Sequence, residues 1–288
     1  GLLVLSSIVG CTPEPIDENR LDFDFVSSDP QTAEGILLNA YTGLVNQTVF
    51  SEAATDDAVS NQLNNGFKRI ANGELTAQFS PLFRWGSYER VFWANRFLEI
   101  LDEGQVMFSR DEVTNDLFVN RLRGEALALR GLHHFYVLQG HAGKNESDEL
   151  LGVPYFKEFI ESDGNFNTPR LSFEETVEAI MEDFDAAIAL LPTDYSNTIN
   201  ENDTQFANVD PGVYNTVNGA QNNLRISGRI VRALKARLAL FAASPAFLNG
   251  QGNYYNVAAD NAACAPSLSP LAIAASLPSC VDKSYPSA

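Results

Sequence analysis

The chain has 288 residues, of which 45% are hydrophobic, and its 37 acidic and 19 basic side chains give a formal net charge of −18. This length is enough for one large domain or two small ones. So negative a field repels nucleic acid and anionic membrane surfaces, and we expect neither as a binding partner.

The first ten residues are apolar and uncharged, and they end at a cysteine that acidic residues soon follow. A stretch this short matches the hydrophobic part of a secretory signal, because a membrane-spanning helix needs ~20 apolar residues. Ile8-Val9-Gly10-Cys11 resembles a bacterial lipobox, in which the cysteine thiol is lipidated. We interpret residues 1–10 as a signal remnant, Cys11 as the lipidation site and residues 11–27 as a flexible tether. The alternative is a buried cysteine in an ordinary hydrophobic segment.

Helical periodicity begins near residue 28. Ser28-Asp29-Pro30 predicts a helix start, because proline is favoured at the first helical position. An apolar face follows at spacings of three and four, made by Ala33, Leu37, Ala40, Tyr41, Leu44 and Val45.

Residues 61–73 are rich in Asn and Gly and are predicted to be a polar loop. Ser80-Pro81 is expected to open a second helix, whose stripe comprises Tyr88, Val91, Phe92, Asn95, Leu98 and Leu101.

Three further helices are predicted in the second half of the chain. Ser109 with Glu112, and Ser172 with Glu175, resemble capping boxes at helix starts. The first would open a long helix through Leu117, Leu122, Ala126, Leu129 and Val137, and the second a helix that stops at Pro192. The last helix is expected from about Ser227 to Ser244-Pro245. Residues 194–223, with Tyr195, Tyr214 and many Asn, form either a binding edge or a disordered insertion.

The fold class is all-α, because alternating strand patterns are nearly absent and residues 152–156 are at most a short extended link. Helices joined by loops of uneven length can stack in pairs as a tetratricopeptide-like scaffold. The 34-residue consensus of that repeat is not visible in the chain.

The run from Arg121 to Gly143, followed by Gly152 to Phe156, resembles the central signature of the SusD/RagB family, the nutrient-binding outer-membrane lipoproteins of Bacteroidetes. The residues that match it in order are Glu125-Ala126, Leu129-Arg130, Phe135-Tyr136, Gly143 and Val153-Pro154. Three other blocks agree: Trp85-x-x-Tyr88 with Ala94-Asn95, Arg170 through Asp183 to Leu191-Pro192, and Ile226-Ser227 through Arg237-Leu238. The order of these blocks carries the resemblance.

The resemblance implies a SusD-like helical domain over residues 28–257, with long irregular loops. Family members are considerably longer, so we expect this domain to be incomplete at its C-terminal side. Residues 258–288 are rich in Ala, Ser and Pro and form an atypical tail, near which the family leads us to expect another amphipathic helix. Cys264 and Cys280 in this tail remain unassigned, because two cysteines establish no disulfide framework.

The resemblance also implies a function. A SusD-like protein is a cell-surface lipoprotein that captures an oligosaccharide or another large nutrient and passes it to a SusC-like TonB-dependent transporter, a β-barrel over which it sits as a lid. Glu14, Asp17 and Glu18 resemble the surface-export signals of such lipoproteins, which favours the outer leaflet of the outer membrane.

Sugars present apolar C–H faces and hydroxyl edges, so a glycan site needs flat aromatic rings beside amides or guanidinium groups. Residues 61–73, with Phe83-Arg84-Trp85, offer this mixture. The ligand-binding candidates are therefore Asn64, Asn65, Arg69 and Trp85. The alternative is that Trp85 packs in the core and the asparagines serve the turn.

No catalytic or metal-binding motif is present in the chain, which lacks H-E-x-x-H, G-x-S-x-G and G-x-x-x-x-G-K-[ST]. His133 and His134 diverge by about 100° on a helix, and His141 is two turns from His134, so we expect these histidines on the helix surface or at an interface, without a metal. Glu125 and Arg130 are predicted to make buried polar contacts. We expect neither enzymatic activity nor a cofactor.

Two other classes of protein remain open. A helical-repeat adaptor that grips a protein or peptide would show the same apolar stripes, but would not need a lipobox. A surface-anchored glycoside hydrolase with paired carboxylates would share the anchor and the substrate, but would release new reducing ends where a binding protein only retains the glycan.

Overall fold

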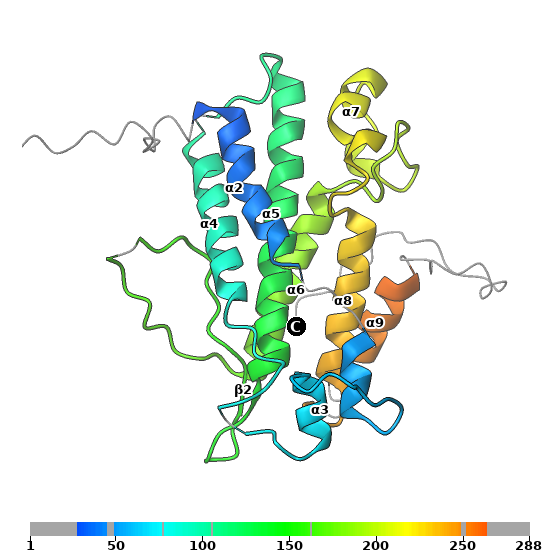
Figure 1. Ribbon diagram of the computed structural model, residues 1–288. Coiled ribbons are helices and arrows are strands. Elements are labelled where there is room, and N and C mark those ends of the chain that lie inside the picture. Colours follow the sequence, from blue (N-terminus) through cyan, green and yellow to red (C-terminus); the bar gives the residue numbers. More distant parts are fainter. Residues whose placement is uncertain are drawn as a thin grey trace, which may run out of the picture.

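The computed structural model describes residues 28–44, 49–76, 78–104, 106–161, 163–248 and 252–263, which are mostly helical (Figure 1). The predicted signal remnant, the predicted lipidation site Cys11, the predicted tether and the tail cysteines Cys264 and Cys280 lie outside these residues. Within them, no helix combines the length and the apolar character that crossing a membrane requires.

The elements follow one another as helices with a single hairpin after the longest helix. They are α2 (Pro30–Thr42), the 3-10 helix η1 (Val49–Ala54), α3 (Gly66–Ala71), α4 (Ser87–Glu103), α5 (Glu112–His141), β1 (Gly143–Lys144), β2 (Leu150–Leu151), α6 (Phe173–Leu190), η2 (Thr204–Phe206), α7 (Pro211–Asn218), η3 (Ala220–Asn222), α8 (Gly228–Ala243) and α9 (Tyr254–Ala263). β1 and β2 pair antiparallel, with Gly143 opposite Leu151.

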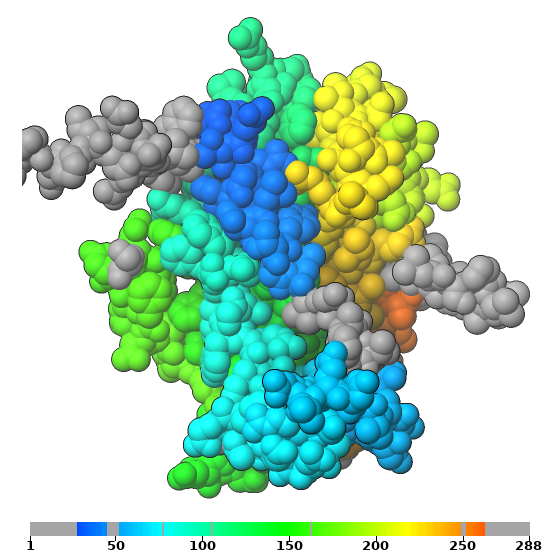
Figure 2. Space-filling model, viewed as in Figure 1, coloured from blue at the N-terminus to red at the C-terminus, as the bar shows by residue number. Residues whose placement is uncertain are grey.

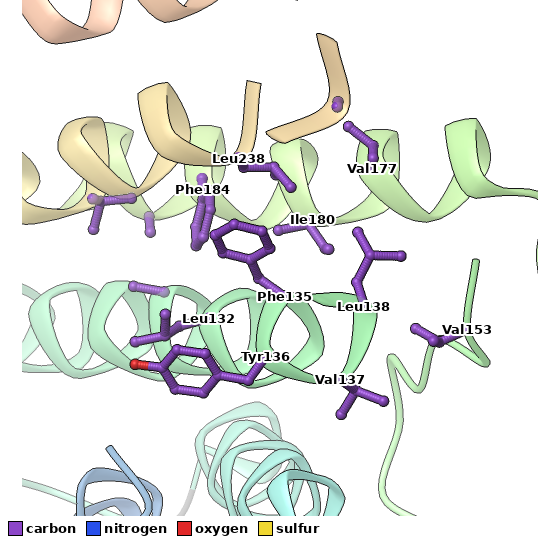
Figure 3. Packing of buried hydrophobic residues seen from close by; sticks show 14 of the residues in the cluster. Leu132, Phe135, Tyr136, Val137, Leu138, Val153, Val177, Ile180, Phe184 and Leu238 are labelled. Carbon is purple, nitrogen blue, oxygen red and sulfur yellow. The ribbon is translucent and has the colours of Figure 1, made fainter. Parts of the chain in front are cut away.

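The long helix α5 lies at the centre of the molecule, with α2 and α4 on one side and α6 and α8 on the other (Figure 1). One hydrophobic core fills the space among α2, α4 and α5, and a second fills the space among α5, α6 and α8. In the second core, Phe135 points from α5 toward Ile180 of α6 and Leu238 of α8 (Figure 3). Because both sides of α5 are covered, its middle turns are buried all the way round.

Most helices pack on the next helix in the chain: α4 on α5, α5 on α6 and α8 on α9. α6 packs on α8, and α7, which lies between them in the chain, packs on α5. This arrangement is the all-α, tetratricopeptide-like scaffold that the sequence predicts. The additional helix near the tail is also present, since α9 packs against α8 and buries Ala258.

Helix starts agree with the sequence where a side-chain cap is made. Asp29 accepts a hydrogen bond from the Thr32 backbone N–H at 2.8 Å, which caps α2 ahead of Pro30. The capping box of Ser172 and Glu175 is confirmed, because each side chain accepts from the other residue's backbone N–H, at 3.1 and 2.9 Å.

Two predicted helix starts are wrong. Ser80-Pro81 does not open α4, which begins at Ser87, because the intervening residues turn and pack against the end of α5. Ser109 does not cap α5 either. The cap is Asp111, whose carboxylate accepts from the Thr114 backbone N–H at 2.9 Å.

Both predicted polar loops contain helices. Residues 61–73 include the short helix α3. Residues 194–223 include α7, and Tyr214 from this helix packs with Leu117 of α5 in a small third core. The segment is therefore an ordered insertion, and it buries the rings of both Tyr195 and Tyr214.

The predicted buried contacts of Glu125 and Arg130 are confirmed. Arg130 forms a two-pronged ion pair with Asp183 (2.8 and 2.6 Å) and also donates to the Asn95 side chain and the Lys157 carbonyl. Glu125 accepts from donors on three other segments of the chain. These networks tie irregular segments to α5, which is a structural role.

Candidate functional site

An exposed aromatic cluster forms where the C-terminus of α5 meets the turn before α4. We call Phe83, Trp85 and His141 the aromatic platform. Trp85 stacks on His141 with ring centroids 3.6 Å apart and an interplanar angle of 27°, and Phe83 stacks on the same imidazole at 5.1 Å. Trp85 remains 55% exposed although its indole stacks on His141, so a large part of the ring system meets solvent.

Close backbone contact positions the platform. Gly140, in the last turn of α5, lies so near the Leu82 carbonyl that a Cβ at this position would be 2.3 Å from that oxygen. Only glycine admits this approach. The Arg84 backbone N–H then donates to His141 Nε2 at 3.1 Å, and the Arg84 guanidinium donates to the carbonyls of Pro81 and Phe83, which closes the turn.

His141 is held in its neutral form by this geometry. Its Nε2 accepts a hydrogen bond and therefore carries no proton. Burial, followed by the nearby guanidinium groups of Arg170 and Arg84, lowers the pKa of His141 below its usual value of 6.5. The platform at neutral pH is thus uncharged, as suits stacking against the C–H face of a sugar.

The other candidates from residues 61–73 lie on α3 and the turn before it. Asn65 is buried and caps α3, because its side-chain oxygen accepts from the backbone N–H groups of Phe67 and Lys68. Arg69 donates to Glu74 at 2.7 Å and lies over the ring of Phe79, 3.6 Å from its centroid. Asn64 is exposed.

The structure places this segment and the platform at the same end of the molecule. Gly66, at the start of α3, packs against Pro81 and Phe79, which directly precede the platform in the chain. Figure 2 shows the residues that follow α2 as a protruding lobe below α2 and α4. Asn64 and Trp85 are the candidates that face solvent, whereas Asn65 and Arg69 make local contacts.

The described residues also form two concavities, neither of which is lined by a platform residue. A small cavity of about 90 Å³ lies between α4 and the segment that contains Phe156 and Phe166, and its lining, which includes Tyr88 and Phe92, is almost wholly apolar. An open groove of about 300 Å³ runs along α6, where Glu175, Glu178 and Glu182 lie beside Lys157. Carboxylates in such a groove could accept hydrogen bonds from sugar hydroxyls.

The histidines were expected on the helix surface or at an interface, and the surface alternative is wrong for His133 and His134, which are both fully buried where α5 packs against its neighbours. Because α5 is covered on both sides, its middle turns have no surface position. In the part of the chain that the structure describes, no three His, Cys, Asp or Glu side chains gather as metal ligands.

The contribution of His141 to the platform could not be predicted from the sequence. Phe83 and Trp85 stand next to a predicted helix, but His141 is more than fifty positions further along the chain. The only available signal was an aromatic ring in the last turn of a long helix, which many helices share.

Comparisons with known proteins identify similar chains. A family model described as "Starch-binding associating with outer membrane", of the SusD-like group, matches residues 28–209. A search of curated proteins gave no match. A SusD-like protein from Bacteroides fragilis is 19% identical, with a TM-score of 0.60 over 85% of this chain and 39% of its own.

Two further solved structures give the same result. A SusD superfamily protein from Parabacteroides distasonis is 19% identical, with a TM-score of 0.55 over 82% of this chain and 44% of its own. A laminarin-binding SusD-like protein is 21% identical, with a TM-score of 0.52 over 75% of this chain and 41% of its own. Likeness at these identities shows the fold, and this chain spans about two fifths of the length of these structures.

Proposed function

Because the chain belongs to the SusD-like family, whose description is starch-binding and associated with the outer membrane, we propose that it is a glycan-binding protein whose stacking surface is the exposed indole of Trp85. The observation that carries this assignment is a tryptophan that faces solvent while its inner face is fixed on His141. A ring held in one orientation loses little conformational entropy when a sugar stacks on it.

Polar groups near the platform complete the proposed site. Asn64 would donate to and accept from sugar hydroxyls, and Arg69, held by Glu74, would present its remaining guanidinium donors. Asn65 would act indirectly, because it caps α3 and so fixes the turn that carries Asn64. The laminarin-binding SusD-like protein among the structural neighbours supports the ligand class.

The delivery role is a proposal of the same kind. Lipidation at Cys11 would anchor the domain to the outer membrane, and the captured nutrient would pass to a SusC-like TonB-dependent transporter. In this proposal the protein binds without catalysis and needs no cofactor.

The stacking role is tested by titrating the protein with a panel that contains maltoheptaose and laminarin oligosaccharides and following binding by calorimetry. We expect Trp85→Ala to weaken binding of the glycan that the wild-type protein selects by about tenfold, because a well-placed aromatic contact contributes ~1.5 kcal/mol. Tyr255→Ala is a matched control, since Tyr255 is similarly exposed, at 54%, but lies on α9. Equal losses in both variants would contradict the assignment.

Two experiments separate the remaining roles. New reducing ends after prolonged incubation with the bound glycan would identify a hydrolase and overturn the binding-only proposal.

Gentle solubilisation of the outer membrane, followed by mass spectrometry, should recover a TonB-dependent barrel with the tagged wild-type protein. Cys11→Ala should abolish this recovery, and a wild-type protein that is membrane-bound but purifies without a barrel would contradict the delivery role.

A further inference from the structure

Trp85 stacks on His141, a residue to which the proposed binding site assigns no role of its own. His141 is the last residue of α5, and its imidazole is the surface on which both Phe83 and Trp85 stack. The centroid of the imidazole lies 3.6 Å from that of the indole, whereas the other ring stacked on Trp85, that of Tyr88, lies 6.2 Å away. Without His141, the indole would therefore lose its close stacking partner.

His141 is itself fixed from two directions. Its Nε2 accepts from the Arg84 backbone N–H at 3.1 Å, and its carbonyl accepts from the Arg170 guanidinium at 2.9 Å. Arg170 is anchored in turn by a 2.8 Å hydrogen bond to the Gly152 carbonyl. His141 therefore connects two segments to the end of α5: its imidazole holds the turn before α4, and its carbonyl holds the segment before α6.

A second proton on this imidazole must go to Nε2, the atom that accepts from Arg84. Protonation therefore breaks the hydrogen bond from the Arg84 backbone and leaves two N–H groups, that of Arg84 and that of Nε2, pointing at each other. The charged groups that act on His141 are the guanidinium of Arg84 from the turn and that of Arg170 from the segment before α6. The new positive charge would thus be repelled from two sides, and burial and these cations lower the pKa of His141.

We propose that His141 is a positioning residue for glycan binding: its neutral ring, hydrogen-bonded to the Arg84 backbone, holds the Trp85 indole outward, and protonation releases it. This inference rests on the proposed stacking role of Trp85. An imidazolium attracts an indole, and this attraction opposes the release. It does not restore the lost hydrogen bond to Arg84, and it does not remove the repulsion by the guanidinium groups of Arg84 and Arg170. Affinity for glycan therefore falls as the pH drops below the usual titration range of histidine.

The first test needs no glycan. Trp85 and Trp93 are the two tryptophans of the chain, so Trp93→Phe leaves the indole of Trp85 as the sole tryptophan emitter. In this background we expect one titration of Trp85 fluorescence as the pH falls below about 6.5, and its loss in His141→Phe, which keeps a ring but cannot be protonated. A fluorescence titration that is unchanged in His141→Phe would overturn the proposal.

The second test separates the ring from its hydrogen bond. His141→Phe retains a stacking surface and loses the acceptor, whereas His141→Gln retains an acceptor and loses the ring. With maltoheptaose, or with laminarin oligosaccharide if that is the glycan bound, wild-type affinity should fall about fivefold from pH 7 to pH 5. His141→Phe should bind without this pH dependence, and His141→Gln should bind more weakly than His141→Phe at pH 7.

The outcomes distinguish the two proposals. If Trp85→Ala binds glycan as the wild type does, the stacking role is wrong, while the fluorescence titration still reports whether His141 controls the indole. If Trp85→Ala weakens binding but both His141 variants retain wild-type affinity and its pH dependence, the positioning role is wrong. Thermal unfolding of each variant by circular dichroism shows whether the helical fold is kept.

Discussion

The carboxylate of Glu125 has no exposed surface, so its charge depends entirely on donors from the protein. It accepts from Tyr41 Oη at 2.8 Å, Tyr195 Oη at 3.2 Å and Arg225 Nη1 at 2.9 Å. Glu125→Ala would remove the acceptor of the Tyr41 hydroxyl and leave Tyr195 with the Ile226 carbonyl and Arg225 with Glu34. We expect it to lower the free energy of unfolding by about 3 kcal/mol, because a buried ion-pair partner is lost. Urea denaturation measures this loss. Glu125→Gln, which keeps an acceptor of the same size, should be less destabilising, and equal losses would contradict this account.

At the scale of single residues, the sequence predicts buried polar contacts more readily than it predicts which side chains are exposed. Glu125 and Arg130 were predictable as buried polar contacts, because charged residues in an apolar helical run need partners. Trp85 was not, since an aromatic residue before a helix packs inward as readily as it faces solvent. Its exposure depends on His141, whose position is set by the length of α5 and by the close contact at Gly140.

Among the elements, α6 and α5 offer a matched pair of helix starts. Ser172 accepts from the Glu175 backbone N–H in a true capping box, whereas Ser109 stands before α5 in the same sequence pattern without capping it. Ser172→Ala should therefore lower the free energy of unfolding by about 1 kcal/mol. Ser109→Ala should change it by less than about 0.5 kcal/mol, as ordinary surface substitutions do. Urea denaturation compares the two, and a larger loss at Ser109 would show that the cap has been assigned to the wrong residue.

The course of the helices was predictable because their apolar stripes are long, but some of their boundaries were not. α6 and α8 begin and end within about a residue of the predicted limits, where caps or prolines mark them. α2 begins as predicted but ends at Thr42, short of the predicted face that included Leu44, which is exposed. The start of α4 shifts from Ser80 to Ser87, because contact with the end of α5 holds the intervening turn. Tertiary contacts of this kind leave no periodic signal in the sequence.

At the scale of the whole molecule, two histidines at its centre link the fold to pH. His134 donates from Nδ1 to the Arg130 carbonyl at 2.9 Å and accepts at Nε2 from the Phe156 backbone N–H at 3.1 Å, so both nitrogens are used by the neutral ring. His133 hydrogen-bonds the Ala40 carbonyl at 2.8 Å, which joins α5 to α2. Burial lowers the pKa of His134 to about 3 and that of His133 to about 4.

In the unfolded chain both histidines regain a pKa near 6.5. Because the folded-state values are the lower ones, the unfolded chain binds protons first as the pH falls. The stabilising contribution is therefore complete above about pH 6.5 and is lost progressively toward pH 4 and 3. Between pH 7 and pH 5 each histidine should lower the free energy of unfolding by about 2 kcal/mol.

Urea denaturation at the two pH values measures this loss, at a pH where most carboxylates are still ionised. His134→Gln should be less stable than the wild type at pH 7, because it replaces two well-aligned hydrogen bonds in the interior. It should nevertheless lose less stability on acidification than the wild type, by about 2 kcal/mol between pH 7 and pH 5, since of the two fully buried histidines only His133 then remains. A variant whose stability falls as steeply as that of the wild type would show that acid acts elsewhere in the molecule.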